Sequence, residues 1–149
     1  MNIMNDAEFK AALGRLTPQQ QRIAAASFVD SVLALSHDPR VVAAVAAAQR
    51  PEVSEVELQM QHHSAKAAAV ASYTQCGHQC DWLGQAGHFV AKAAEACVEP
   101  MQERGAHHAW ETAMRARMAR TCEAIGLGQG TDNSEAEVQY RILDTFINS

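Results

Sequence analysis

The chain has 149 residues, of which 48% are hydrophobic but only 5% aromatic, and its formal net charge is -5. A chain of this length is expected to form a single domain, here residues 1–149, around one hydrophobic core. The acidic balance argues against nucleic acid binding, which needs clustered lysine and arginine, and no segment reaches the roughly 18 consecutive apolar residues of a membrane span. Because the N-terminal segment lacks the basic and apolar regions of a signal peptide, we expect a cytoplasmic protein with reduced cysteines.

Four sites carry the capping-box pattern, in which a side chain before a helix and another three residues later satisfy the first free backbone amides. Asp38 before Pro39 predicts one further helix start, and the helix that it opens should run from Val41 to about Gln49 before Pro51. The four capping boxes are Asn5 with Glu8, Thr17 with Gln20, Ser54 with Glu57, and Ser134 with Glu137.

Apolar residues recur at helical spacing in each segment that these signals open. The pattern from Ser54 is disturbed around residues 74–77 and resumes at Trp82, and Gly126 fits the C-cap of the helix that follows. No alternating run of β-branched residues predicts a strand, so the expected fold is all-α, a compact bundle of about six helices. The predicted core residues are Phe28, Val32, Met60, Trp82, Phe89, Val90, Cys97, Trp110, Met114, Ile142 and Phe146.

A short sequence occurs twice: His62-x-x-Ala65-Lys66-Ala67-Ala68 recurs 26 residues later as His88-x-x-Ala91-Lys92-Ala93-Ala94. One interpretation is chance similarity in an alanine-rich region. The other is that two similar helices pack against each other through small residues.

Cysteine and histidine gather in one region and are the ligands that transition metals such as zinc prefer. The candidate ligands are Cys76, Cys80, His63 and His88, with His63 expected to point inward on the stripe that also holds Val56, Met60, Ala67 and Val70. However, no second cysteine pair follows, and reduced cysteine usually packs as a small apolar residue. Core packing is therefore the favoured interpretation of the thiols, and a metal site is the alternative.

Other polar groups give weaker signals. His62 and His108 are expected on the surface, and Arg115, Arg117 and Arg120 on a solvated helix face. The glycine-rich segment 126–131 follows a helix rather than a strand, which is typical of a linker and not of a phosphate loop. No recognised catalytic motif occurs, so no catalytic residue is predicted.

One family resemblance rests on Asp38-Pro39-Arg40 followed by alanine-rich helices, and on Gly84-Gln85-Ala86-Gly87-His88 further along. Over about residues 28–98 the chain resembles immunity proteins of bacterial polymorphic toxin systems. The resemblance implies a helical protein that neutralises a toxin by binding it, without enzymatic activity.

Together these features predict a non-enzymatic binding protein without a cofactor, whose partner is another protein, a toxin if the resemblance holds. A homodimer is a second expected arrangement. The alternative function is a metal- or thiol-dependent bundle that uses Cys76, Cys80 and histidines.

Overall fold

The computed structural model describes residues 2–76, 81–100 and 107–149. Within these ranges the chain forms seven α-helices and one short 3-10 helix and contains no strand, so the all-α prediction is confirmed, with one helix more than about six. The helices are α1 (Asp6–Gly14), α2 (Pro18–Val32), η1 (Leu33–Leu35), α3 (Pro39–Gln49), α4 (Glu55–Cys76), α5 (Trp82–Cys97), α6 (His108–Gly126) and α7 (Glu135–Ile147).

Most helix starts follow the local cap signals. Thr17 forms a complete capping box, because the Gln20 amide donates to Thr17 Oγ1 at 3.2 Å while the Thr17 amide donates to Gln20 Oε1 at 2.9 Å. Asn5, Asp38 and Ser54 also accept a hydrogen bond from an amide in the first turn.

The cap of α7 differs from the prediction. Ser134 makes no side-chain cap bond, since its backbone (φ -100°, ψ 16°) is not in the extended conformation that places an N-cap side chain over the first turn. Instead, Asn133 Oδ1 accepts from the Glu135 amide at 3.1 Å.

The glycine that ends α6 lies two residues later than predicted. Gly128, with φ of 76°, is the left-handed residue, and the Gln129 amide donates to the Ala124 carbonyl at 2.8 Å in a Schellman motif. Gly126 is still helical, and a Cβ there would lie 3.2 Å from Trp82 Cβ. This glycine therefore permits close approach of α5 to α6.

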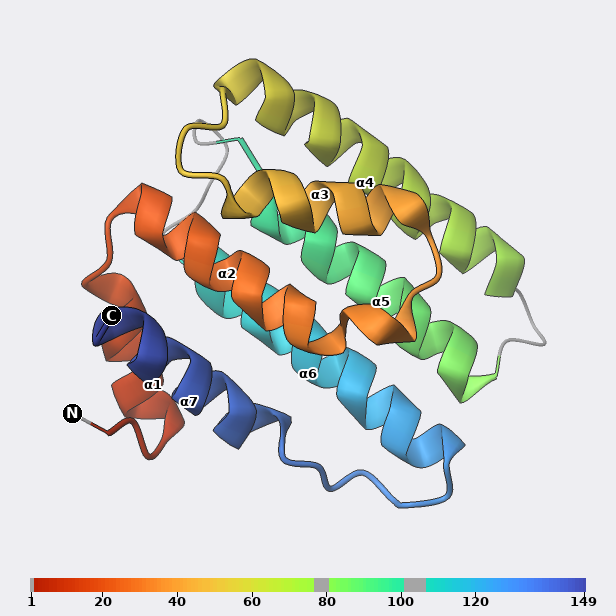
Figure 1. The fold of residues 1–149 in the computed structure, drawn as a ribbon. Helices are drawn as coiled ribbons and strands as arrows, with labels where there is room; N and C mark the ends of the chain where they lie inside the picture. The colour runs from red at the N-terminus through yellow and green to blue at the C-terminus, as the bar shows by residue number, and fades with distance from the viewer. Residues whose placement is uncertain (1, 77–80, 101–106) are drawn as a thin grey trace.

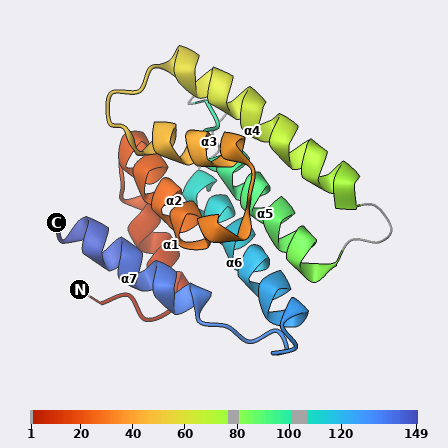
Figure 2. The same cartoon turned by 45° about the vertical axis from the view of Figure 1, so that its right-hand side comes forward.

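The helices form two rows, with α4, α5 and α6 side by side in one and α3 and α2 packed on one side of them (Figures 1 and 2). The short helices α1 and α7 lie at the edge that carries both termini (Figure 1). The first row is packed through alanines, since Ala65 and Ala68 of α4 and Ala91 and Ala94 of α5 are buried. Small side chains let helix axes approach closely, which explains a core with few aromatic residues.

The predicted core residues fall into three groups by burial. Phe28, Val32, Val90 and Cys97 are buried, and Phe89, Trp110, Met114, Ile142 and Phe146 are half-buried against the core. Met60 and Trp82 correct the prediction, because they are 67% and 44% exposed. On α4 the inward positions belong to Leu58 and to alanines, so Met60 lies on the opposite side of the helix.

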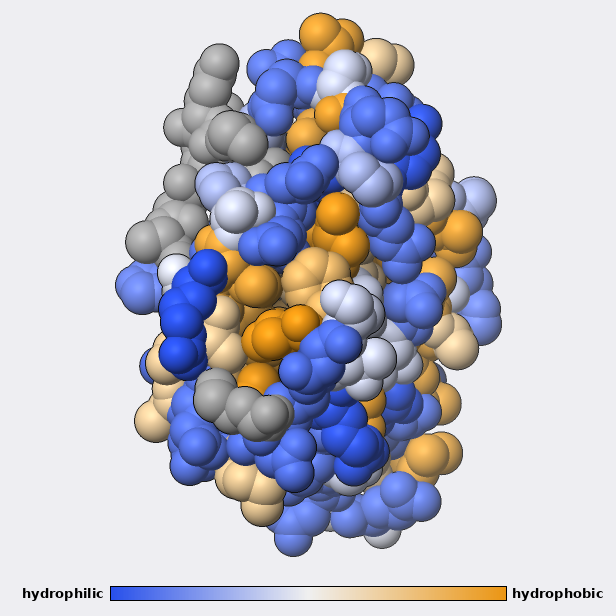
Figure 3. Space-filling view, turned by 60° about the vertical axis from the view of Figure 1, so that its left-hand side comes forward, coloured by the Kyte–Doolittle hydropathy of each residue, from blue (hydrophilic) through white to orange (hydrophobic). Residues whose placement is uncertain are grey.

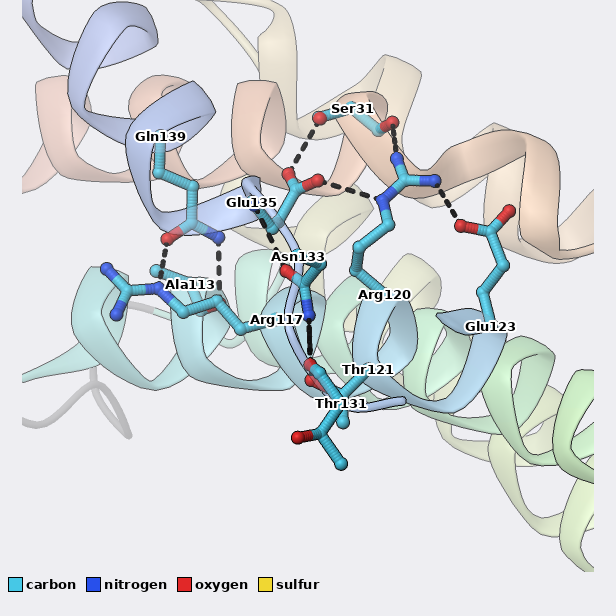
Figure 4. A network of polar contacts seen from close by, with 10 residues as sticks. All are labelled: Ser31, Ala113, Arg117, Arg120, Thr121, Glu123, Thr131, Asn133, Glu135 and Gln139. Atoms are coloured by element: carbon cyan, nitrogen blue, oxygen red, sulfur yellow. Dashed lines mark hydrogen bonds and ion pairs between the residues drawn. The ribbon is translucent and has the colours of Figure 1, made fainter. Parts of the chain in front are cut away.

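Charged side chains attach α7 to the bundle (Figure 4). Glu135, only 2% exposed, accepts from Arg120 Nε at 3.0 Å and from Ser31 Oγ at 2.7 Å. Arg117 donates to Gln139 Oε1 at 2.8 Å and also pairs with Asp6 of α1. The prediction of a solvated arginine face is therefore wrong for Arg117 and Arg120, which connect four helices.

Candidate protein-interaction surface

Helix α4 has two apolar faces. The inward one contains Leu58, Ala65 and Ala69, which are buried. The other, which we call the outer face of α4, points away from the bundle, and its residues follow one another at alternating intervals of four and three. It consists of Val56, Met60, His63, Ala67 and Val70, all exposed, with Val56 67% and Val70 59% accessible.

The place of α4 in the bundle explains why this face is open. The helix lies at the outside of its row and packs mainly on α5 and α3 (Figures 1 and 2). Tyr73, 71% exposed, extends the apolar surface toward the C-terminal end of the helix. Exposed apolar residues that form a contiguous stripe mark interaction sites more often than isolated ones do.

Charges flank the outer face unevenly. Glu55 and Glu57 lie in the first turn of α4, and Glu57 forms an ion pair with Arg50. Lys66 is exposed beside the middle of the stripe. The carboxylates at the N-terminal end of this surface are therefore compensated by Arg50 and Arg22, while its middle carries the positive charge of Lys66.

The two histidines among the predicted metal ligands, His63 and His88, do not converge. His63 was expected to point inward and lies instead on the exposed outer face. His88 packs on the inward side of α4, with Nδ1 3.0 Å from both the Ala69 carbonyl oxygen and Ser72 Oγ. The structure therefore separates these two histidines by the width of α4.

The environment of His88 favours its neutral form. Burial lowers the pKa of His88, and the hydrogen bond to the Ala69 carbonyl opposes this effect only in part. The ring also contacts Tyr73 and Phe89, with centroids 5.7 Å and 5.6 Å away. His88 thus joins α5 to α4 as a packing residue.

The structure does not describe the side chains of the two predicted cysteine ligands. Cys76 is the last residue of α4, but its side chain is not described, and Cys80 falls outside the described residues. Within the described ranges, no group of three or more histidine, cysteine or acidic residues could hold a metal ion. The metal site stays a prediction of the sequence.

A small polar hollow lies between α4, α5 and α6. His108, expected on the surface, is 1% exposed, and its Nδ1 lies 4.0 Å from Oε2 of Glu99, one of the residues that line the hollow. The hollow has a volume of about 110 Å³, enough for a few water molecules. It is lined by three carboxylates, two cationic side chains and one histidine: Glu95, Glu99, Glu111, Lys92, Arg115 and His62.

The opposite edge of the molecule has apolar side chains that are only half-buried. A wide groove of about 510 Å³ runs between α2 and α7, with Val138, Ile142 and Phe146 on its apolar part and Asp30 and Arg141 on its polar part. On the side that carries the two termini, hydrophobic side chains form an area broken up by hydrophilic ones (Figure 3). In contrast to the outer face of α4, this groove mixes apolar and charged residues along its length.

No protein-family model, curated protein or solved structure matches the chain. No described helix is both long and apolar enough to cross a membrane. The stripe on α4 was visible in the sequence but assigned to the core, and the signal that identifies it is the presence of a second apolar stripe on the same helix.

Proposed function

We propose that the protein is a non-enzymatic binding protein that holds a partner protein on the outer face of α4. The observation that supports this function is the pair of opposite apolar faces on one helix. A surface helix needs one apolar face to dock on its own bundle. A second apolar face, on which Met60 and Val70 are exposed to solvent, lowers solubility unless a partner protein covers it.

The composition of the face suits this role. Its intervals of four and three residues are those of helices that pack along a common seam. Met60 is a flexible, polarisable side chain that adapts to an apposed surface. The resemblance to immunity proteins makes a bacterial toxin the first partner to consider, and a second copy of the chain is the alternative partner.

A capture experiment with matched variants tests this proposal. The purified full chain serves as bait in a lysate of its source cells, beside the double variant Met60→Glu/Val70→Glu and the control Val42→Glu. Val42 is 50% exposed on α3, outside the outer face, so the control introduces a similar charge elsewhere. We expect a protein retained by the wild type and the control but lost by the double variant, with all three baits melting at similar temperatures.

Two results would contradict the proposal. Equal retention by the double variant would move the binding surface away from α4. Absence of any specifically retained protein, together with a strictly monomeric chain in light scattering, would reject the binding function.

A further inference from the structure

The first and last helices of the chain contact each other directly. The Ile3 amide, just before α1, donates to Asp144 of α7 at 2.9 Å, and the Ile3 side chain is 4% exposed. The Tyr140 hydroxyl of α7 donates to Asp6 of α1 at 2.7 Å. Phe9 of α1 packs on Tyr140, with ring centroids 5.5 Å apart. Residues separated by 134 and 141 positions are therefore joined at the edge that carries both termini (Figure 1).

Arg117 of α6 binds both of these helices with one guanidinium group. The group donates to the two carboxylate oxygens of Asp6 at 2.8 and 3.1 Å, and to Gln139 of α7 at 2.8 Å (Figure 4). It also lies over the rings of Phe9 and Tyr140, 5.6 and 5.8 Å from their centroids. Because α1 and α7 share this side chain and also contact each other, removal of either helix breaks contacts of the other.

The attachment of these two helices to the rest of the bundle is comparatively weak. Helices α1 and α7 pack less extensively on α2 to α6 than those five helices pack on one another. Two of the three buried residues of α7, Glu135 and Gln139, are polar, and Leu143 is the third. Buried ion pairs add little net stability, and elements with few buried apolar contacts open at lower free energies than the core. We therefore expect α1 and α7 to open more readily than the other helices.

The connection between α6 and α7 allows such an opening. Every residue from 126 to 134 is exposed, and Gly128 and Gly130 have positive φ values of 76° and 74°. The Gly128 and Gln129 amides donate to carbonyls in the last turns of α6, so the start of the connection is attached to that helix. The connection can therefore bend without loss of buried apolar surface.

We infer that α1 and α7 open from the bundle together, as one cooperative unit, while α2 to α6 stay folded. Groups that share a network of contacts are coupled, so the loss of one helix lowers the cost of losing the other. The five helices that stay folded keep a core of their own, which includes Val32, Val45, Ala65, Val90 and Ala113.

This opening changes the surface that the protein presents. Phe28 of α2 loses its contact with Phe9, whose ring centroid lies 5.4 Å away in the closed form. Arg117 and Arg120 of α6 lose their acidic partners on α1 and α7. The open form therefore presents an aromatic ring and two guanidinium groups that the closed form holds against the first and last helices.

Native-state hydrogen exchange of the full chain, followed by NMR at increasing urea, tests the inference. In the wild type we expect the slowest amides of α1 and α7 to exchange with the same opening free energy and the same dependence on urea. Both should exchange faster, by about tenfold or more, than the slowest amides of α5, which report global unfolding.

The variant Glu135→Gln distinguishes joint from independent opening, because the Glu135 carboxylate bonds to Arg120 of α6 and Ser31 of α2. It should speed exchange about tenfold in α7, and in α1 by the same factor, since a bond to a charged group is weakened. The control Asp38→Asn removes one carboxylate charge at the start of α3, where Asp38 pairs with Arg40. It should leave exchange in α1 and α7 unchanged.

The inference is overturned if Glu135→Gln speeds exchange in α7 alone or in neither helix. It is also overturned if α1 and α7 exchange no faster than α5, or if Asp38→Asn affects them as Glu135→Gln does. Should Glu135→Gln fail to fold, the wild type decides, because different urea dependences for α1 and α7 would contradict a joint opening.

Discussion

The two edges of the bundle are held in opposite ways. At the α7 edge, charged groups form a network around one buried carboxylate: Glu135 pairs with Arg120 and Ser31, while Arg117 joins Asp6 to Gln139. At the α4 edge, alanines form the inner contact while Met60 and Val70 face solvent. Buried ion pairs define the position of a helix rather than add much stability, whereas exposed apolar residues leave a helix able to accept a neighbour. The α7 edge is therefore held by polar contacts within the bundle, whereas the α4 edge leaves apolar side chains exposed to a possible neighbour.

The sharpest test of this contrast compares the two faces of α4. Leu58→Ala should lower the free energy of unfolding by about 3 kcal/mol, because it leaves a cavity at a fully buried position. Met60→Ala should change it by less than about 0.5 kcal/mol, since the side chain is already in water. Urea unfolding of both variants gives these values, and equal losses would show that Met60 is buried in solution.

At the α7 edge, Arg120→Met should destabilise the fold by about 2 kcal/mol, since it leaves the buried Glu135 carboxylate with Ser31 alone as side-chain partner. Arg120 is partly exposed, so the loss should stay below that of a fully buried pair. The matched control is Glu123→Gln, which alters the more exposed partner of Arg120 and should cost less than about 0.5 kcal/mol. A loss for Arg120→Met no larger than the control would mean that α7 is held by its apolar residues.

The start of α7 gives a smaller effect. Asn133→Ala should cost about 1 kcal/mol by removing the acceptor for the Glu135 amide. Ser134→Ala should be nearly neutral, because its hydroxyl makes no cap bond. Thermal melts of the two variants test this assignment. A larger loss of stability for Ser134→Ala than for Asn133→Ala would show that Ser134 is the N-cap of α7.

The α4–α5 contact predicts a dependence on pH. The folded state lowers the pKa of His88, so below about pH 6.5, the ordinary histidine value, the unfolded chain binds the proton more readily than the folded one. The free energy of unfolding should therefore fall as the pH decreases from about 6.5 toward the folded-state pKa. His88→Gln should flatten this slope in urea titrations, and an unchanged slope would remove His88 as its source.

The smallest expected effect concerns the metal alternative at the end of α4. Chelation should leave the melting temperature unchanged, and Cys76→Ala and Cys80→Ala should cause only the modest losses of small apolar truncations. The metal content of protein purified without an affinity tag distinguishes the binding protein from the metal-dependent bundle. About one zinc, copper or iron per chain, removed by the double cysteine variant, would instead establish the metal-dependent bundle.

Local signals in the sequence predicted most helix limits, as the caps at Thr17 and Asp38 show. A cap is a hydrogen bond between residues two or three apart, so its pattern is readable without knowledge of the fold. The two local errors, Ser134 for Asn133 and Gly126 for Gly128, are displacements of one and two residues. Both arose because neighbouring residues offer the same chemistry and the backbone selects between them.

The faces of the helices were harder to predict, and the candidate surface depended on them. Both stripes of α4 are apolar, and the sequence favoured the one with larger side chains, which placed Met60 and His63 inward. His108 shows the reverse error, since it was assigned to the surface and is buried. Neither error could be seen from helical periodicity alone.

That this protein is helical, and where most of its helices begin and end, could be read from the amino-acid order alone. Which face of α4 is buried, and that Arg120 pairs with Glu135, depend on how distant helices pack. The two differ in range, because helix limits depend on atoms within about one turn. Burial depends on which distant helices have side chains small enough to approach, as Ala91 and Ala94 of α5 do for α4.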